Sequence, residues 1–295
     1  MSYLIDEGQN IQHLLMGNEA IVRGALEAGV NIAAGYPGTP SSEIIESFSK
    51  VAKERNLYVE WSTNEKVAVE VAAAGSFAGL RSLCVMKQNG VNVASDFLLH
   101  LASSGTRGGM LLVSCDDPGA LSSVNEGESR LFARLLEIPL LEPGDIQEAK
   151  DIIPWAFALS EQIRNIVMIR SVTRLSHASG NVRFGPLPDT AAQAAFHYNG
   201  PLLDPDTGPV ISMILAAPEL QHGPQLAKLK KAAEIFETCP FNTYTGPETP
   251  ELLIITSSAC SLYSREAVAI LGLEERVGIL KLATTWPLPR RLLTG

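Results

Sequence analysis

The 295-residue sequence contains only four cysteines, and they lie far apart. Cys84, Cys115, Cys239 and Cys260 form no Cys-x-x-Cys pair, which argues against the usual zinc and iron–sulfur motifs and against a secreted disulfide framework. The five histidines form no pair at metal-ligand spacing, so a histidine metal site is not expected. We expect reduced thiols and a cytoplasmic protein.

Long apolar runs and basic clusters are also missing. No apolar run approaches the roughly 20 residues that cross a bilayer, and the amino-terminal MSYLIDEGQN is polar and acidic, unlike a signal peptide. The net charge is −9 without any run of Lys or Arg, so a nucleic-acid surface is not expected. The sequence also lacks the glycine fingerprint of nicotinamide enzymes and the P-loop of nucleotide-triphosphate enzymes. We predict neither a membrane nor a nucleic-acid partner.

What is present is apolar material in a regular pattern, with 46% hydrophobic and 19% charged residues. From about residue 17 to 172, helix-like segments alternate with short apolar strands, the pattern of a parallel sheet covered on both faces. Asp145 and Glu148 resemble a capping box before the longest helix. We predict a doubly wound α/β domain. Its helices are expected at 18–29, 41–56, 65–79, 93–104, 128–136 and 145–162, and its strands at 30–36, 57–62, 82–87, 109–115, 138–142 and 165–171.

Residues 179–249 do not continue this alternation of helices and strands. They are rich in Gly, Pro, Asn and Asp, which predicts a linker, with one helix at 224–239. Residues 250–295 then give a strand, a helix and a strand, which is too little for a substantial core. We therefore divide the chain into a first domain (1–178), a linker with a helix (179–249) and a partial second α/β domain (250–295).

Three loops that follow predicted strands carry polar side chains, and ligands of open α/β sheets bind at this end of the strands. The loop 35–42, GYPGTPSS, places hydroxyls at a helix N-terminus, which fits either an anionic ligand or a rigid capped turn. Glu65 begins the next helix, where the helix dipole favours a carboxylate and where partial burial would suit acid–base chemistry. The spacing of 86–96, MKQNGVNVASD, does not choose between a site and a well-bonded turn.

Two adjacent aspartates, Asp116 and Asp117, follow a later strand and precede Pro118 and Gly119. Paired carboxylates are suitable ligands for a hard cation. Asp-Asp-Pro-Gly is more often a turn, and we favour the turn.

Together these segments resemble one family, the 2-oxoacid:ferredoxin oxidoreductases, and within it the indolepyruvate enzymes. The similarity covers about residues 12–180 and implies the pyrimidine-binding module of a thiamine-diphosphate fold, while 250–295 resembles the start of a transketolase C-terminal-like domain. The segments that carry the resemblance are LLMGNEAIVRGALEAGV, GYPGTPSSEI, VEWSTNEKVAVEVAAAGSFAGLRSLCVMKQNGVNVASD, DDPG, SSVNE, IPLLEP and LLIITSS through ATTWPLP.

The resemblance implies an activity, its cofactor and its residues. Enzymes of this family decarboxylate a 2-oxoacid oxidatively to an acyl-CoA and pass the electrons through iron–sulfur clusters to ferredoxin. A glutamate that hydrogen-bonds the aminopyrimidine ring of thiamine diphosphate is implied at Glu65. Thr39 is implied to lie near the thiazolium and the substrate carboxylate, with Pro37 in the same cofactor-binding loop. Aryl pyruvates such as indolepyruvate are the implied substrates.

Weaker implications concern the segments that follow. Asn89 and Asn92 are implied to line the cofactor site, and Arg107 to pair with the substrate carboxylate. The sequence departs from the family here, because MKQNGVNVA replaces the usual MKHVGLNVA and SSVNEGESR replaces SSQNEQDSR. If the usual histidine contacts substrate, Gln88 in its place would alter specificity or activity.

The sequence also lacks the Gly-Asp-Gly motif that holds Mg²⁺ and the diphosphate, and the ferredoxin-like cysteines of this family. We therefore expect a shared thiamine-diphosphate site, with Mg²⁺ and [4Fe-4S] clusters on a partner subunit or on a missing part, and an oligomeric assembly. A split enzyme, a truncated chain and a non-catalytic paralogue or assembly subunit all fit. The retained Glu65 and YPGTP loop favour the first two. A transketolase-like or decarboxylase-like half and a Rossmann dehydrogenase are less favoured alternatives.

Overall fold

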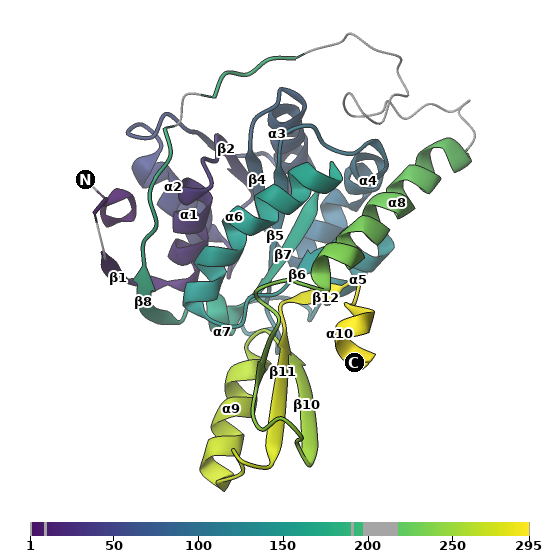
Figure 1. The fold of residues 1–295 in the computed structure, drawn as a ribbon. Coiled ribbons are helices and arrows are strands. Elements are labelled where there is room, and N and C mark those ends of the chain that lie inside the picture. Colours follow the sequence, from purple (N-terminus) through teal and green to yellow (C-terminus); the bar gives the residue numbers. More distant parts are fainter. Residues whose placement is uncertain (1, 9–10, 190–191, 197–217, 295) are drawn as a thin grey trace.

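The computed structural model describes residues 2–8, 11–189, 192–196 and 218–294. The glycine- and proline-rich stretch 198–209, predicted as linker, lies outside them. The chain forms a main domain and a small lobe that projects from it (Figure 1). The helices are α1 (Gly17–Glu27), α2 (Ser42–Val51), α3 (Glu65–Phe77), α4 (Gln88–Ser104), α5 (Arg130–Leu135), α6 (Ile146–Ile163), α7 (Thr173–Ser176), α8 (Pro218–Phe236), α9 (Cys260–Leu271) and α10 (Arg290–Thr294), with a 3-10 turn at Tyr3–Ile5. The strands are β1 (Gln12–Met16), β2 (Ile32–Gly35), β3 (Tyr58–Trp61), β4 (Ser82–Lys87), β5 (Met110–Asp116), β6 (Leu140–Leu141), β7 (Val167–Val172), β8 (Ser179–Arg183), β9 (Thr243–Thr245), β10 (Leu252–Ser257), β11 (Val277–Leu282) and β12 (Thr284–Trp286).

The main domain is built on a seven-stranded sheet in the order β12-β6-β7-β5-β4-β2-β3. Every neighbouring pair is parallel except β12 with β6. Two hydrophobic cores cover its faces, because successive side chains of a strand point to opposite sides. Leu83 and Val85 of β4 join α1, α2 and α6 in one core. Cys84 and Met86 join α3, α4 and α5 in the other. The predicted doubly wound fold is confirmed.

Helix α4 begins five residues earlier than the sequence predicts. Lys87 is extended and serves as its N-cap, and the helix starts at Gln88, directly after β4. Asn89, Gly90 and Asn92 favour loops over helices. Burial of the following apolar residues against α3 and the sheet overrides that local preference. Asn89 and Asn92 therefore lie in the first turns of a helix instead of a loop.

The predicted division into 1–178, 179–249 and 250–295 differs from the structure in two places. The segment 277–286, expected as one strand, divides into β11 in the small lobe and β12 in the main sheet. Parts of the predicted linker also belong to the main domain, because β8 pairs with β1 and α8 packs beside α4 and α6. Short apolar segments do not reveal from composition alone which sheet they join.

The small lobe contains β10, β11 and β9 in that order, with α9 alongside (Figure 1). Its buried hydrophobic core consists of Val268, Val277 and Ile279. Leu252, Leu253 and Ile255 of the edge strand β10 are exposed. Residues 243–282 thus form a small α/β unit. Within the described part of the chain, no helix combines the length and the apolar character required to span a bilayer.

Candidate functional site

The main sheet has a topological switch point between β2 and β4. The chain places β3 on one side of β2 and then crosses to place β4 on the other side. The loops that leave β2 and β4 diverge at such a point, and ligands of doubly wound sheets bind there. Thr39 and Glu65 follow the ends of β2 and β3, whereas Lys87 ends β4 and Asn89 comes two residues later. We call these four residues the switch-point site.

The loop after β2 is held by its own hydroxyls. The Gly38 amide donates to Ser42 Oγ at 2.9 Å, and Ser41 Oγ donates to the Gly38 carbonyl at 2.7 Å. Buried Asn18 of α1 donates to the Pro40 carbonyl at 2.8 Å. Thr39 itself is exposed, with a cis peptide bond to Pro40. These hydrogen bonds therefore hold exposed Thr39 and exposed Pro37 on a rigid turn.

Glu65 is the first residue of α3, and Asn64 caps that helix by accepting a hydrogen bond from the Val67 amide at 3.0 Å. The Glu65 side chain is half-buried and lies against Gly90 of α4, where an added Cβ would stand 2.5 Å from its Cγ and 2.8 Å from its Oε1. No hydrogen bond or ion pair joins its carboxylate to any residue that the structure describes. A carboxylate held by packing but without a protein partner is free to bind a ligand.

The other predicted residues divide into two groups. Asn89 is half-buried and Asn92 is exposed, both in the first turns of α4, and an added Cβ on Gly127 would stand 3.8 Å from Asn89 Oδ1. Arg107 lies at the far end of α3, where its guanidinium donates to the carbonyls of Phe77 and Ala195 at 3.5 and 2.9 Å. The 13 residues of α3 place Glu65 roughly 18 Å from that end.

The prediction that Arg107 lines the same cleft is therefore wrong. The connection from α4 to β5 carries this residue to the amino ends of the strands, which is the opposite edge of the sheet. Only the carboxyl ends of the strands meet at the switch point.

Lys87 is the cation that the structure places at the switch point. It ends β4, and its side chain packs against Gly38, where an added Cβ would stand 2.9 Å from Lys87 Cδ. Its ammonium donates to the Ser122 carbonyl at 3.2 Å. The sequence feature that could have identified Lys87 is its position as the last residue of a predicted buried strand, at the carboxyl edge of the sheet.

The loop 117–129 closes one side of this site. A Cβ on Gly127 would stand 2.8 Å from Gln88 Cγ, and Gln88 Nε2 donates to Ser123 Oγ at 3.4 Å. Gln88 is buried, and its Oε1 has no partner within the described residues. The loop is tied to Asp117, whose carboxylate accepts from the Ser122 amide and Ser123 Oγ at 2.7 and 2.8 Å. Asp117 is thus occupied by protein donors, as expected for a turn.

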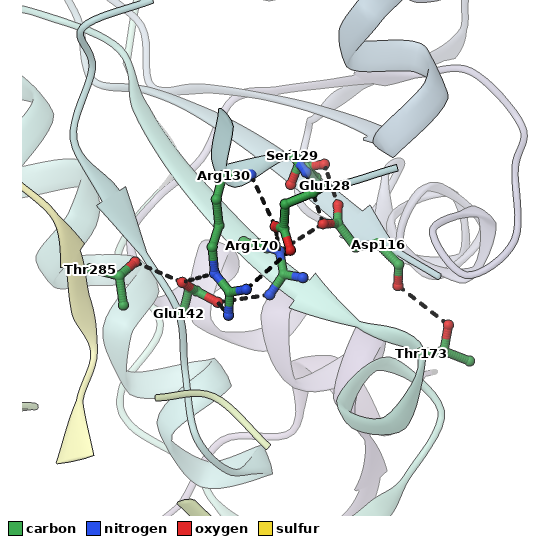
Figure 2. A network of polar contacts seen from close by, with 9 residues as sticks. Asp116, Glu128, Ser129, Arg130, Glu142, Arg170, Thr173 and Thr285 are labelled. Atoms are coloured by element: carbon green, nitrogen blue, oxygen red, sulfur yellow. Dashed lines mark hydrogen bonds and ion pairs between the residues drawn. The ribbon is translucent and has the colours of Figure 1, made fainter. Parts of the chain in front are cut away.

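A buried ion-pair network holds the base of the same loop (Figure 2). Arg170 of β7 donates to Asp116 at 2.7 Å and to Glu142 at 2.8 Å, and all three residues are buried. Asp116 also accepts from the Ser129 amide at 3.1 Å. Glu142 further accepts from Arg130 at 2.8 and 2.7 Å. The network therefore fixes both the start and the end of loop 117–129.

The network extends to the strand that enters the main sheet from the small lobe. Thr285, the central residue of β12, donates to Glu142 at 2.7 Å (Figure 2). Burial alone would raise the pKa of Glu142, but the hydrogen bond from Arg130 and the charges of Arg170 and Arg130 outweigh it and lower the pKa below its usual value. Glu142 is therefore ionised in the folded protein at neutral pH.

This lowered pKa predicts an acid-dependent part of the stability. A carboxyl group with a lower pKa in the folded state stabilises it above the unfolded-state pKa, here about 4.5, and loses that contribution as pH falls through the folded-state value. We expect the free energy of unfolding of Glu142→Gln, measured with urea, to fall less steeply than wild type below pH 4.5. Glu266→Gln, on the exposed surface of α9, should keep the wild-type slope. Identical slopes for all three proteins would contradict the assignment.

Within the described residues there is no group of three or more His, Cys, Asp or Glu side chains that could hold a metal ion. The switch-point site instead offers the Glu65 carboxylate, the Thr39 hydroxyl on its rigid loop and the Lys87 ammonium group. Such a set suits an organic ligand with a basic ring nitrogen and an acidic substituent.

Comparison with known proteins identifies the family. Residues 23–235 match the model described as pyruvate flavodoxin/ferredoxin oxidoreductase, thiamine diphosphate-binding. The chain belongs to this family. The resemblance inferred from the GYPGTPSSEI and VEWSTNEKVAVEVAAAGSFAGLRS segments is thus confirmed.

Among its relatives, the chain is 42% identical to the indolepyruvate oxidoreductase subunit IorA of Pyrococcus horikoshii over 280 residues, which is 95% of this chain and 43% of that protein. It is 40% identical to the IorA subunit of Methanothermobacter marburgensis over 291 residues, 98% of this chain and 46% of that protein. The chain therefore spans less than half the length of these oxidoreductase subunits.

A solved member of the family has the same fold. The 2-oxoglutarate:ferredoxin oxidoreductase of Magnetococcus marinus, with 2-oxoglutarate, coenzyme A and succinyl-CoA bound, superposes with a TM-score of 0.76. The sequences are 18% identical, and the match covers 96% of this chain and 55% of that one.

Proposed function

We propose that this chain supplies the pyrimidine-binding part of a thiamine-diphosphate site in a cytoplasmic 2-oxoacid:ferredoxin oxidoreductase. The reaction is the oxidative decarboxylation of an aryl pyruvate such as indolepyruvate to its acyl-CoA, with ferredoxin as electron acceptor. The observation that carries the proposal is the Glu65 carboxylate, which is held against Gly90 and has no partner within the described residues. The names of the IorA relatives support the choice of substrate.

The residues present fit the cofactor. Thiamine diphosphate would supply the carbanion-stabilising chemistry of the decarboxylation. Glu65 would hydrogen-bond the aminopyrimidine ring, and Pro37, Thr39, Asn89 and Asn92 would line the same site. We propose that Lys87, in place of Arg107, pairs with the substrate carboxylate.

Another polypeptide or a further part of this one is proposed to complete the site. It would carry the diphosphate-binding module with Mg²⁺ and the iron–sulfur clusters. Exposed apolar side chains on the segments at and after the ends of β2, β3, β4 and β5 support this, because exposed apolar surface can mark contact regions. They are Tyr36, Trp61, Val93, Leu121 and Val124.

The proposal is tested by purifying the tagged chain anaerobically from its own cells. We expect it to bring down a partner with iron–sulfur clusters and bound thiamine diphosphate, and to reduce a viologen dye when indolepyruvate and coenzyme A are added. Activity with pyruvate or 2-oxoglutarate instead would change the proposed substrate. A complex without thiamine diphosphate and without activity would favour the non-catalytic assembly subunit.

Replacing Gly90 with alanine tests how Glu65 is held. The added Cβ would stand 2.5 Å from Glu65 Cγ, so the carboxylate must move. We expect at least a tenfold loss of 2-oxoacid-dependent activity in the purified complex. The added Cβ would also stand 2.9 Å from Met86 Cβ, so the melting temperature is measured beside the activity to detect a loss of folding. Gly223→Ala in α8, where the added Cβ meets nothing within 4 Å, is the matched control and should keep full activity. Full activity of Gly90→Ala would contradict the role of this contact.

A further inference from the structure

A cavity of about 750 Å³ lies where the small lobe meets the main domain. Its walls come from the chain following β5, from β7 and α7, and from the start of α9. Leu121, Val172 and Tyr263 provide apolar and aromatic surface. A volume of this size accommodates a small organic molecule.

The charges around the cavity leave one arginine unpaired. Arg130 and Arg170 line it, but Glu128, Asp116 and Glu142 neutralise both (Figure 2). His177 also lines it and faces Glu43, with 3.4 Å between His177 Nε2 and Glu43 Oε1.

Arg174 of α7 is different. Its Nε donates to Tyr263 Oη at 2.5 Å, and no acidic side chain within the described residues pairs with it. The remaining guanidinium nitrogens of Arg174 are thus available to an acceptor outside the protein.

The start of α9 presents the positive end of a helix dipole at the same wall. This helix of 12 residues has no side-chain cap, because its N-cap residue is Ala259. Helix N-termini attract negative charge. Ser258 lines the cavity as well, with only 3% of its surface exposed, and its hydroxyl has no partner within the described residues. A buried hydroxyl left unsatisfied is destabilising, and a ligand oxygen would satisfy it.

We propose that this cavity binds a small organic molecule that carries an oxyanion, either a carboxylate or a phosphate. Arg174, the Ser258 hydroxyl and the N-terminus of α9 bind the oxyanion, and Leu121, Val172 and Tyr263 contact the apolar body. The ligand would then bridge the main domain and the small lobe, because Arg174 and Val172 belong to the first and Ser258 and Tyr263 to the second.

Cys260 provides a direct reporter of occupancy. It lines the cavity and is exposed, whereas Cys84, Cys115 and Cys239 are buried. Neutral iodoacetamide should alkylate Cys260, and the rate is followed by mass spectrometry of the peptide that contains it. Benzoate, its neutral isostere benzamide, and phenyl phosphate serve as probes. We expect benzoate or phenyl phosphate to slow alkylation in a saturable manner, with benzamide at least about tenfold weaker. The stronger of the two anions identifies the oxyanion.

Two variants and one control sharpen the test. Arg174→Gln should weaken protection by the anion about tenfold. Ser258→Ala should also weaken it severalfold while the melting temperature stays equal or rises, because an unpaired buried hydroxyl is removed. Lys50→Gln removes one exposed positive charge of α2 and should leave protection unchanged.

Equal protection by benzamide and benzoate, or no protection by any probe, would overturn the proposal. So would unchanged protection in both Arg174→Gln and Ser258→Ala. The measurement involves neither Glu65 nor thiamine diphosphate, so its outcome is independent of the proposed function.

Discussion

Glu65→Gln is expected to lower kcat of the purified complex by about 10²–10⁴-fold, the range found when a positioned acid–base group is removed. Glutamine keeps the size of the side chain and its packing against Gly90. It loses the negative charge, which we propose stabilises the protonated aminopyrimidine ring of the bound cofactor. The activity is measured as indolepyruvate-dependent viologen reduction, with the melting temperature as a check on folding.

Glu70→Gln is the matched control for this variant. Glu70 lies on the same helix and is half-buried like Glu65, but it is further from the carboxyl edge of the sheet. The control should retain at least half of the wild-type activity. If Glu65→Gln and Glu70→Gln were equally active, Glu65 would have no catalytic role and the assembly-subunit alternative would gain support.

Arg170→Met is expected to lower the free energy of unfolding by about 3–5 kcal/mol, the usual cost of removing one partner from a buried ion pair. Methionine fills much of the space of arginine, so the loss arises mainly from the charges left behind. Asp116 and Glu142 are both buried and would each lose a hydrogen-bonded cation (Figure 2). Urea unfolding at pH 7 measures the change.

Arg276→Met removes an arginine whose pair with Glu251 is exposed, and such pairs contribute little. We expect its free energy of unfolding to match wild type within error. Arg170→Lys should fall between the two, since lysine keeps the charge but not the two-pronged geometry. If Arg170→Met were as stable as Arg276→Met, the network would not be what fixes loop 117–129.

The main sheet and its helices could be predicted from the sequence because apolar residues are spaced differently in strands and in helices. Strands such as SLCVMK have four consecutive apolar residues at their centre, which is typical of a strand buried on both faces, and the helices between them have polar sides. Strands β2, β3 and β4 occur within the residues where the sequence predicts them, and β5 and β7 each end one residue later than predicted. Asp145 also caps α6 as predicted, accepting a hydrogen bond from the Glu148 amide at 2.9 Å.

What the sequence did not reveal depends on contacts between distant segments. The early start of α4 depends on packing that overrides the weak helix propensity of Asn89, Gly90 and Asn92. The pairing of β12 with β6 joins residues more than 140 positions apart. Arg107 was predicted at the cleft because an arginine suits a substrate carboxylate. The residue type alone does not show that this arginine lies at the amino edge of the sheet. The roles of exposed Thr39 and half-buried Glu65 remain predictions that rest on the family resemblance and on their positions shortly after predicted strands.

We propose that Glu65 contacts the pyrimidine ring of thiamine diphosphate at the switch point of the main sheet. A structure of the native complex, purified anaerobically with thiamine diphosphate, tests it most directly through one distance. We predict that a Glu65 carboxylate oxygen lies within hydrogen-bonding distance, about 2.6–3.2 Å, of a pyrimidine ring nitrogen. A complex in which partner side chains occupy this edge and Glu65 contacts no cofactor would contradict the account.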